Sequence, residues 1–257
     1  MNLGPLALLA TAAAAYLLGT RRARRWPRWR SAAYLGGLIV LAAALASPLP
    51  TRAEEQLSLH MLQHLMIVGL AAPLIVLGAP LTLAVRVLRG PARARAVAVA
   101  RALRPFGHPA IGLGLFTATM LATHLTPLYS AAVDHPALHE LEHGLYLTGG
   151  LAFWWPLLGA EPLPRRLTAT GRLTYPLLAM PAMGAVGALM MAAPHALYAS
   201  YPSIADQRLA GALMWVAGSG PLLVAAVLET WRALMREERR VAVRDALADR
   251  RGGVARR

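Results

Sequence analysis

Long apolar stretches separated by arginine-rich segments constrain this chain more than any other feature of its sequence. A helix needs roughly 20 mostly apolar residues to cross the hydrocarbon core of a membrane. Seven stretches approach or meet that length: 3–20, 31–49, 57–80, 109–129, 138–159, 173–199 and 206–228. The strand alternation that a membrane barrel would need is absent. The sequence therefore predicts an all-α integral membrane protein, a bundle of seven transmembrane helices.

Arginine is distributed unevenly between the segments that connect these stretches. The chain has 26 basic residues, all of them arginine, and 24 lie in four blocks: 21–30, 86–104, 161–172 and 229–257. Only Arg52 and Arg208 fall on the other side of the predicted bundle. Because arginine and lysine accumulate on the cytoplasmic side of membrane proteins, this pattern predicts an N-terminus outside and a C-terminus in the cytoplasm. Topology and lipid headgroups account for the net charge of +14, so we expect no nucleic-acid partner.

The same topology predicts how the chain is divided. Residues 1–228 form the seven-helix transmembrane domain, and residues 229–257 form a cytoplasmic, basic, amphipathic tail. Segment 86–104 is expected to be a surface helix at the inner leaflet. Tryptophans at the inner ends of the spans would form an aromatic belt at that interface. They are Trp26, Trp29, Trp154, Trp155 and Trp231.

Six of the eight histidines fall at the outer ends of the predicted spans. They are His60, His64, His124, His139, His143 and His195. Asp206 opens the last span at the same level. Ionisable groups at membrane depth are costly and usually mark function. A helix rises 1.5 Å per residue, so these side chains would occupy one layer on the order of 10 Å deep. The layer predicts a metal site on the extracytoplasmic side.

The residue types around this layer indicate which metal it would hold. The chain has no cysteine, so imidazole, carboxylate and thioether are the remaining protein ligands. Met120 and Met191 each precede a histidine by one turn, and imidazole combined with thioether favours copper. Gln63 and Glu142 share helix faces with the two histidine pairs, and we expect them to orient the imidazoles from behind.

Several motifs, in this order, resemble the multi-span, caa-type CtaG family of cytochrome c oxidase assembly factors. The first is His60-Met-Leu-Gln-His64, which runs into Ala72-Pro-Leu-Ile-Val-Leu-Gly-Ala-Pro80. The others are His124-Leu-Thr-Pro-Leu-Tyr129, His139-Glu-Leu-Glu-His143, Phe153-Trp-Trp-Pro156 and Asp206-Gln207, leading to Gly211 and Met214-Trp215. The resemblance covers roughly residues 30–230.

The resemblance implies a non-enzymatic protein of the bacterial plasma membrane that helps to mature a haem–copper oxidase, with an oxidase subunit as its partner and copper as the metal. It points to the six histidines and Asp206 as the functional set. The oligomeric state stays open, a homodimer included.

Two other functions fit parts of the same pattern. His139-Glu140-x-x-His143 matches the zinc metallopeptidase motif H-E-x-x-H, and with Glu142 the segment also matches H-x-x-E-H. A membrane zinc metallohydrolase is therefore the alternative, although it leaves His60 and His64 without a role. A haem-binding electron carrier, with two histidines as haem ligands, is a third hypothesis.

Overall fold

The computed structural model describes residues 3–162 and 166–254, and the described residues contain helices and no strand. The first half of the chain contains α1 (Leu3–Arg22), α2 (Arg28–Ala46), α3 (Leu49–Ala53), α4 (Leu57–Leu65), the π-helix η1 (Met66–Ala71), α5 (Ala72–Leu77), α6 (Pro80–Val87), α7 (Gly90–Ala102), the 3-10 helix η2 (Arg104–Gly107) and α8 (Pro109–Leu125). The second half contains α9 (Leu128–Asp134), α10 (Pro136–Leu158), α11 (Ala169–Ala192), α12 (Ile204–Ala212), the π-helix η3 (Leu213–Ala217) and α13 (Gly218–Val254).

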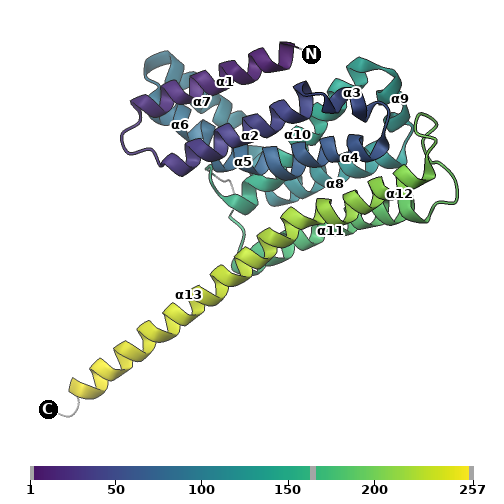
Figure 1. Ribbon diagram of the computed structural model, residues 1–257. Helices are drawn as coiled ribbons and strands as arrows, with labels where there is room; N and C mark the ends of the chain where they lie inside the picture. Colours follow the sequence, from purple (N-terminus) through teal and green to yellow (C-terminus); the bar gives the residue numbers. More distant parts are fainter. Residues whose placement is uncertain (1–2, 163–165, 255–257) are drawn as a thin grey trace.

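The helices form a bundle whose centre is the run α4–η1–α5 packed against α10 and α8 (Figure 1). Helices α1 and α2 cover one side of this centre, and α11, α12 and the start of α13 cover the other. The short helices α3 and α9 and the start of α12 lie together at one end of the bundle, while α6 and α7 lie toward the other end. The candidate site lies near the end with α3 and α9.

Four helical segments are long and apolar enough to cross a membrane: Arg28–Ala46, Leu57–Val87, Ala169–Ala192 and Ile204–Arg244. The apolar helix Pro109–Leu125 is shorter. The all-helical architecture is thus confirmed for the described residues. Each of the seven predicted stretches is mostly helical, but 109–129 is broken between α8 and α9 and 173–199 runs past the end of α11 at Ala192. The number of crossings and the sidedness of the termini stay predictions.

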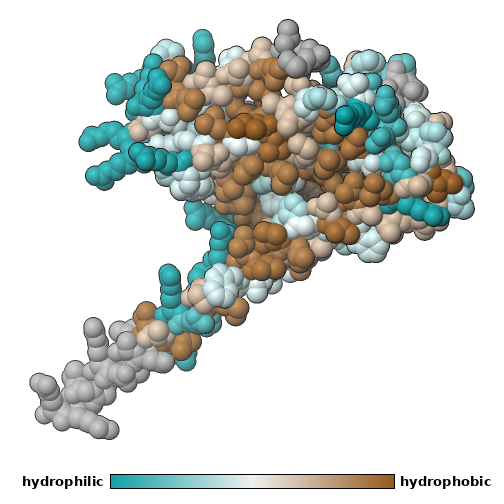
Figure 2. Space-filling model, in the orientation of Figure 1, coloured by the Kyte–Doolittle hydropathy of each residue, from teal (hydrophilic) through white to brown (hydrophobic). Residues whose placement is uncertain are grey.

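The surface of the bundle fits a lipid environment. Large apolar side chains such as Ile39, Leu178 and Val216 are more than half exposed to their surroundings. Hydrophobic residues cover much of the visible side of the bundle, whereas hydrophilic residues gather at its ends (Figure 2). Contiguous exposed apolar surface of this kind marks a membrane or protein contact.

The structure agrees with some details of the sequence prediction and differs from others. Helix α7, which covers 90–102, has no buried residue, as expected for a surface helix. Helix α13 continues without interruption across the expected boundary at residue 229, and residues 255–257 lie outside the described part of the chain. The aromatic belt is wrong for Trp154 and Trp155, which are 3% and 8% exposed. Packing of α10 against η1 buries Trp154, and its indole N–H donates to the carbonyl of Val68, 2.8 Å away.

Glycines let neighbouring helices of the bundle approach so closely that their backbones are in contact. A Cβ on Gly112 of α8 would lie 2.3 Å from the Ala152 carbonyl oxygen of α10. On the other side, Gly187 of α11 and Gly211 of α12 approach each other's carbonyl oxygens in the same way. Membrane helices use small residues at such contacts because van der Waals packing, rather than hydrophobic burial, drives their association.

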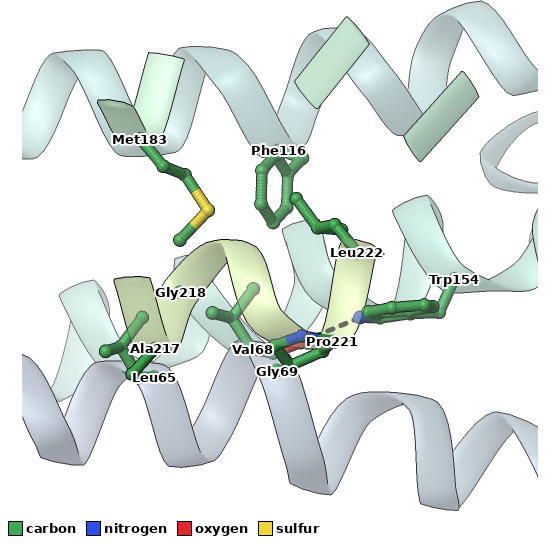
Figure 3. A pocket seen from close by; sticks show the side chains of 10 residues that line it. All are labelled: Leu65, Val68, Gly69, Phe116, Trp154, Met183, Ala217, Gly218, Pro221 and Leu222. Atoms are coloured by element: carbon green, nitrogen blue, oxygen red, sulfur yellow. Dashed lines mark hydrogen bonds between the residues drawn. The ribbon is translucent and has the colours of Figure 1, made fainter. Parts of the chain in front are cut away.

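Apolar side chains gather around one small cavity in the middle of the bundle (Figure 3). The cavity found there has a volume of about 10 Å³, room for one water at most. Apolar side chains from α4, η1, α8, α10, α11 and α13 line it, among them Phe116, Met183 and Leu222.

Candidate metal centre

Two pairs of histidines from α4 and α10 face each other near one end of the bundle. His60 and His64 lie one turn apart on α4, and His139 and His143 lie one turn apart on α10. One ligand atom from each of the four lies within 4.8 Å of all the others. The i,i+4 spacing places both members of a pair on one helix face, and packing of α10 against the α4–η1 run brings the two faces together. The four are hereafter called the four-histidine group.

The spacing of the imidazoles suits a shared metal ion. The Nε2 atoms of His60 and His64 are 3.1 Å apart. Metal–nitrogen bonds of about 2.0–2.1 Å would place two nitrogens of a tetrahedral ion roughly 3.3 Å apart. Across the helix interface, the ring centroids of His60 and His139 are 4.9 Å apart, and those of His64 and His143 are 5.4 Å apart. Four imidazoles therefore surround one small volume.

A tyrosine on the segment before α12 orients His60. The Tyr201 hydroxyl donates its hydrogen to the Ala53 carbonyl, 2.7 Å away. The same oxygen lies 2.9 Å from His60 Nδ1, so it accepts a hydrogen bond from that nitrogen. With its proton on Nδ1, His60 directs the lone pair of Nε2 toward the four-histidine group. Support of an imidazole from its far side is typical of metal-binding histidines.

Glu142 lies beside the four-histidine group and has no hydrogen-bond partner. Its side chain is buried, and one carboxylate oxygen is 4.0 Å from His60 Nε2 and 3.9 Å from His64 Nε2. Both carboxylate oxygens are buried without a partner, as are His64 Nδ1, His139 Nε2 and His143 Nε2. Buried polar atoms are almost always paired, and so many orphans in one place fit a cation that the surrounding atoms would bind.

Gln63 and Asp206 hold α4 in place instead of facing the group directly. The amide N–H of Gln63 donates to the Ala44 carbonyl of α2, 2.9 Å away. Asp206, in the first turn of α12, accepts hydrogen bonds from the backbone N–H and the hydroxyl of Ser58. Ser58 lies half a turn before His60, so Asp206 fixes the start of the helix that carries the first pair.

The structure places His124 next to the four-histidine group but outside it. His124 lies on α8, and its Nε2 contacts the sulfur of Met61 at 3.3 Å. The ring of Tyr129 lies between the two places, 5.0 Å from the His60 ring and 5.5 Å from the His124 ring. Met120 meets His124 through its backbone carbonyl, 2.9 Å from Nδ1, and not through its sulfur.

His195 and Met191 lie apart from the buried cluster. His195 is exposed on an irregular segment between α11 and α12, and Met191 is 39% exposed on α11. The His195 carbonyl accepts a hydrogen bond from Gln207, so its backbone supports the turn. The structure therefore brings four of the six predicted histidines together, sets His124 beside them and leaves His195 outside.

Sequence reasoning missed the tyrosines and the methionine that surround these histidines. Tyr129, Tyr146 and Tyr201 are almost completely buried, and Tyr146 stacks on the His64 ring at 4.2 Å. Neither they nor Met61 forms a repeating pattern. The adjacency of Met61 to His60 and the place of Tyr129 in the His124 motif were the only signals available in the sequence.

A large cavity opens onto one side of the four-histidine group. It has a volume of about 1120 Å³ and lies between α10 and the helices α1, α2 and α3. His139 and His143 line it, together with Gln63 and the carboxylates of Glu54 and Glu140. The first histidine pair is buried, whereas the α10 pair is partly exposed toward this cavity.

A family model described as cytochrome c oxidase caa3 assembly factor matches residues 14–236, which include every residue of the cluster. The chain belongs to this family. It is also 30% identical over 255 residues to an uncharacterized protein of Mycobacterium leprae, covering 90% of this chain and 38% of that protein. Uncharacterized proteins of Mycobacterium bovis and Mycobacterium tuberculosis are 29% identical over 254 residues, covering 91% of this chain and 38% of theirs.

The chain thus spans about two-fifths of the length of these curated relatives. No solved structure matches it.

Proposed function

We propose that this protein handles copper during assembly of a haem–copper oxidase. It binds the ion in the four-histidine group and passes it to an oxidase subunit docked alongside. The observation that carries the proposal is the four buried or half-buried imidazoles whose ligand atoms lie within 4.8 Å of one another in a member of the caa3 assembly factor family. Copper is the cargo, and the protein performs no chemistry on it.

The donor set fits copper, with zinc as the alternative. Imidazole binds both metals well, and no thiolate competes, since the chain has no cysteine. The Glu142 carboxylate supplies a negative charge that would offset the charge of the ion in a dry environment. A site without thiolate holds copper by exchangeable ligands, which suits a carrier that must release its cargo.

The position of the site supports delivery on the extracytoplasmic side of a bacterial plasma membrane. In the proposed topology the chain crosses seven times, with the N-terminus outside and the basic C-terminal tail in the cytoplasm. The four-histidine group then lies at the outer leaflet, opposite the arginine-rich segments. Lipids surround the bundle, and the oligomeric state, including a homodimer, is open.

The two histidine pairs divide the task of holding and releasing the ion. His60 and His64 are buried and held by Tyr201, Gln63 and Asp206, so they form the fixed half of the site. His139 and His143 line the large cavity and form the accessible half. An ion would reach the site, and leave it, through that cavity.

The geometry gives less support to a zinc hydrolase. A catalytic zinc keeps an open position for water, whereas four imidazoles would complete a tetrahedral shell. Glu140, the base of an H-E-x-x-H site, is exposed and does not face the buried pair. Glu142 is better placed, but the two histidines of α4 lie next to it and occupy the space of a substrate.

Metal analysis of the purified full-length chain tests the proposal. The protein in detergent is loaded anaerobically with Cu(I), or separately with Zn(II), washed, and measured by elemental mass spectrometry. We expect copper to be retained, and the ion held by the four-histidine group to be lost when His60, His64, His139 and His143 are all replaced by alanine. The control is His135→Ala, an exposed histidine just before α10. Unchanged copper in the four-alanine variant would overturn the assignment.

Two further outcomes address the alternatives. Zinc retained while copper washes away would favour the hydrolase, and a peptidase assay of Glu140→Gln and Glu142→Gln would follow. A Soret band in the visible spectrum of the purified protein would favour the haem carrier.

A further inference from the structure

The contact between His124 and Met61 brings together two groups that do not form an ordinary hydrogen bond. His124 Nε2 lies 3.3 Å from the Met61 sulfur. Both side chains are buried, at 6% and 2% exposed, and they come from different helices, α8 and α4. A thioether sulfur has no hydrogen to donate and is only a weak acceptor. The bonding of this pair therefore depends on where the imidazole carries its proton.

The hydrogen bonds around His124 place that proton on Nδ1. The Met120 carbonyl oxygen lies 2.9 Å from Nδ1 and can only accept a hydrogen bond. The neighbouring hydroxyl of Thr123 donates to the Thr119 carbonyl, 2.9 Å away, and so has no hydrogen left for Nδ1. Nδ1 therefore donates, and in the neutral ring Nε2 carries only a lone pair.

A lone pair on nitrogen thus faces lone pairs on sulfur across 3.3 Å in a buried place. An imidazolium would supply the missing hydrogen, but a buried cation without a carboxylate partner is strongly disfavoured. A metal ion bound by both atoms would satisfy them together. Tyr129 adds a second unsatisfied group beside the pair, because its ring lies 5.5 Å from that of His124 and its fully buried hydroxyl has no hydrogen-bond partner.

We propose that His124 Nε2 and Met61 Sδ form a second metal site, selective for Cu(I), beside the four-histidine group. Thioether sulfur is a soft ligand that selects Cu(I) over Zn(II), whereas imidazoles alone accept both metals. The nitrogen and the sulfur are the two ligands that the structure brings together, and a small movement of either side chain would widen their 3.3 Å separation to admit the ion. The proposal rests on the proposed copper function and adds a separate position for the ion.

The two positions are separated by aromatic side chains and not by solvent. The Tyr129 ring lies between the His60 and His124 rings, and Tyr146 stacks on His64 while its hydroxyl reaches Thr123 beside His124. The soft site is the more deeply buried of the two, since neither His124 nor Met61 lines the large cavity. It is suited to retain Cu(I) more firmly than the accessible four-histidine group.

X-ray absorption of the Cu(I)-loaded full-length protein tests this site, combined with titration against a coloured Cu(I) chelator. We expect the wild type to bind two Cu(I) ions and to show a copper–sulfur shell at the copper edge. Met61→Leu should lose that shell and half of the copper while it keeps the copper–nitrogen shell. This exchange conserves side-chain volume and is well tolerated in cores. Retained Zn(II) binding shows that the variant is folded.

Met183→Leu is the matched control, because Met183 is as deeply buried as Met61 but lies in the apolar middle of the bundle. It should keep both ions and the copper–sulfur shell. His124→Gln should lose the same single ion as Met61→Leu, which keeps the test decisive if either variant folds poorly.

The outcomes separate the two proposals. A wild type that binds one Cu(I) without a copper–sulfur shell, or a shell that persists in Met61→Leu, would overturn the second site and leave the copper function standing. A wild type that binds no copper would overturn both.

Discussion

The same helices build two very different regions of this protein within a few turns of each other. At the end of the bundle with α3 and α9, the helices α4, α8 and α10 contribute histidines, tyrosines and a carboxylate, many with buried polar atoms that lack a partner. Further along, they and η1 contribute apolar side chains around a cavity of about 10 Å³ (Figure 3). The middle holds the helices together, and the end with α3 and α9 carries polar groups that packing alone does not require. The comparison separates stability from the proposed metal binding, and we expect substitutions in the two regions to affect them differently.

The largest expected effect is the loss of metal from the four-histidine group. Replacing His60 and His64 together by alanine removes the fixed half of the site, and we expect metal affinity to fall more than about 100-fold, above the 10- to 100-fold typical of supporting residues. Competition with a chelator of known affinity measures this. Stability without metal should also fall, because the variant loses two buried rings and the hydrogen bond between His60 and Tyr201, so its free energy of unfolding is measured in parallel. Strong destabilisation of the metal-free variant would contradict the view that the histidine end contributes little to stability.

A cavity in the apolar middle should have the opposite effect. Phe153→Ala removes a fully buried ring that packs on Phe116 and Tyr175, with centroids 4.6 and 4.8 Å away. We expect a loss of about 2–3 kcal/mol in the free energy of unfolding, somewhat below the soluble-protein range because lipid also solvates the unfolded ring. Unfolding in mixed detergent micelles measures it. Metal bound per folded chain should stay the same, and a loss of metal would show that the regions are coupled.

Removing the Tyr201 hydroxyl tests whether the hydrogen bond that orients His60 contributes to metal affinity. Tyr201→Phe leaves His60 Nδ1 and the Ala53 carbonyl without their partner while keeping the ring. We expect metal affinity to fall about 10- to 100-fold, as for other groups that orient a metal-binding histidine, and stability to fall by about 1 kcal/mol. Tyr198→Phe is the control, since that hydroxyl bonds only the His124 carbonyl. Equal losses in both variants would contradict a specific role for Tyr201.

The smallest expected effect concerns access through the large cavity. Glu54→Gln with Glu140→Gln removes two carboxylates that line it but leaves the four imidazoles in place. We expect metal uptake to slow a few-fold, more at low salt than at high salt, because charges at an opening attract cations over a screened distance. Stopped-flow loading measures the rate, and the final stoichiometry should be unchanged. A rate independent of both substitution and salt would place the access route elsewhere.

The sequence predicted the features that depend on helical periodicity. Each histidine pair spaced by one turn necessarily shares a face, so the joining of His60, His64, His139 and His143 followed once α4 and α10 were placed side by side. The helices also fall where the apolar stretches predicted them.

Features that depend on how one helix packs on another were not predictable from spacing. Met61 points away from the His60 face, and only the packing of α8 reveals its contact with His124. His195 was assigned to a span, but α11 ends at Ala192 and Pro194 follows, which leaves His195 on an irregular segment. The sequence placed Asp206 in the layer of the histidines, but its contact with Ser58 could not be predicted because the two residues are far apart in the sequence.

Helix α13 extends far beyond the bundle that it helps to build (Figure 1). Its 37 residues from Gly218 to Val254 give a rod of about 55 Å at 1.5 Å per residue, against a hydrocarbon core of about 30 Å. Because the helix is continuous, a small tilt at its root beside Pro221 is magnified into a wide sweep at its far end. A partner bound at the far end of α13 would therefore act at a distance on the root of the helix, which packs on α11, η3 and η1, and η1 continues the helix that carries His60 and His64.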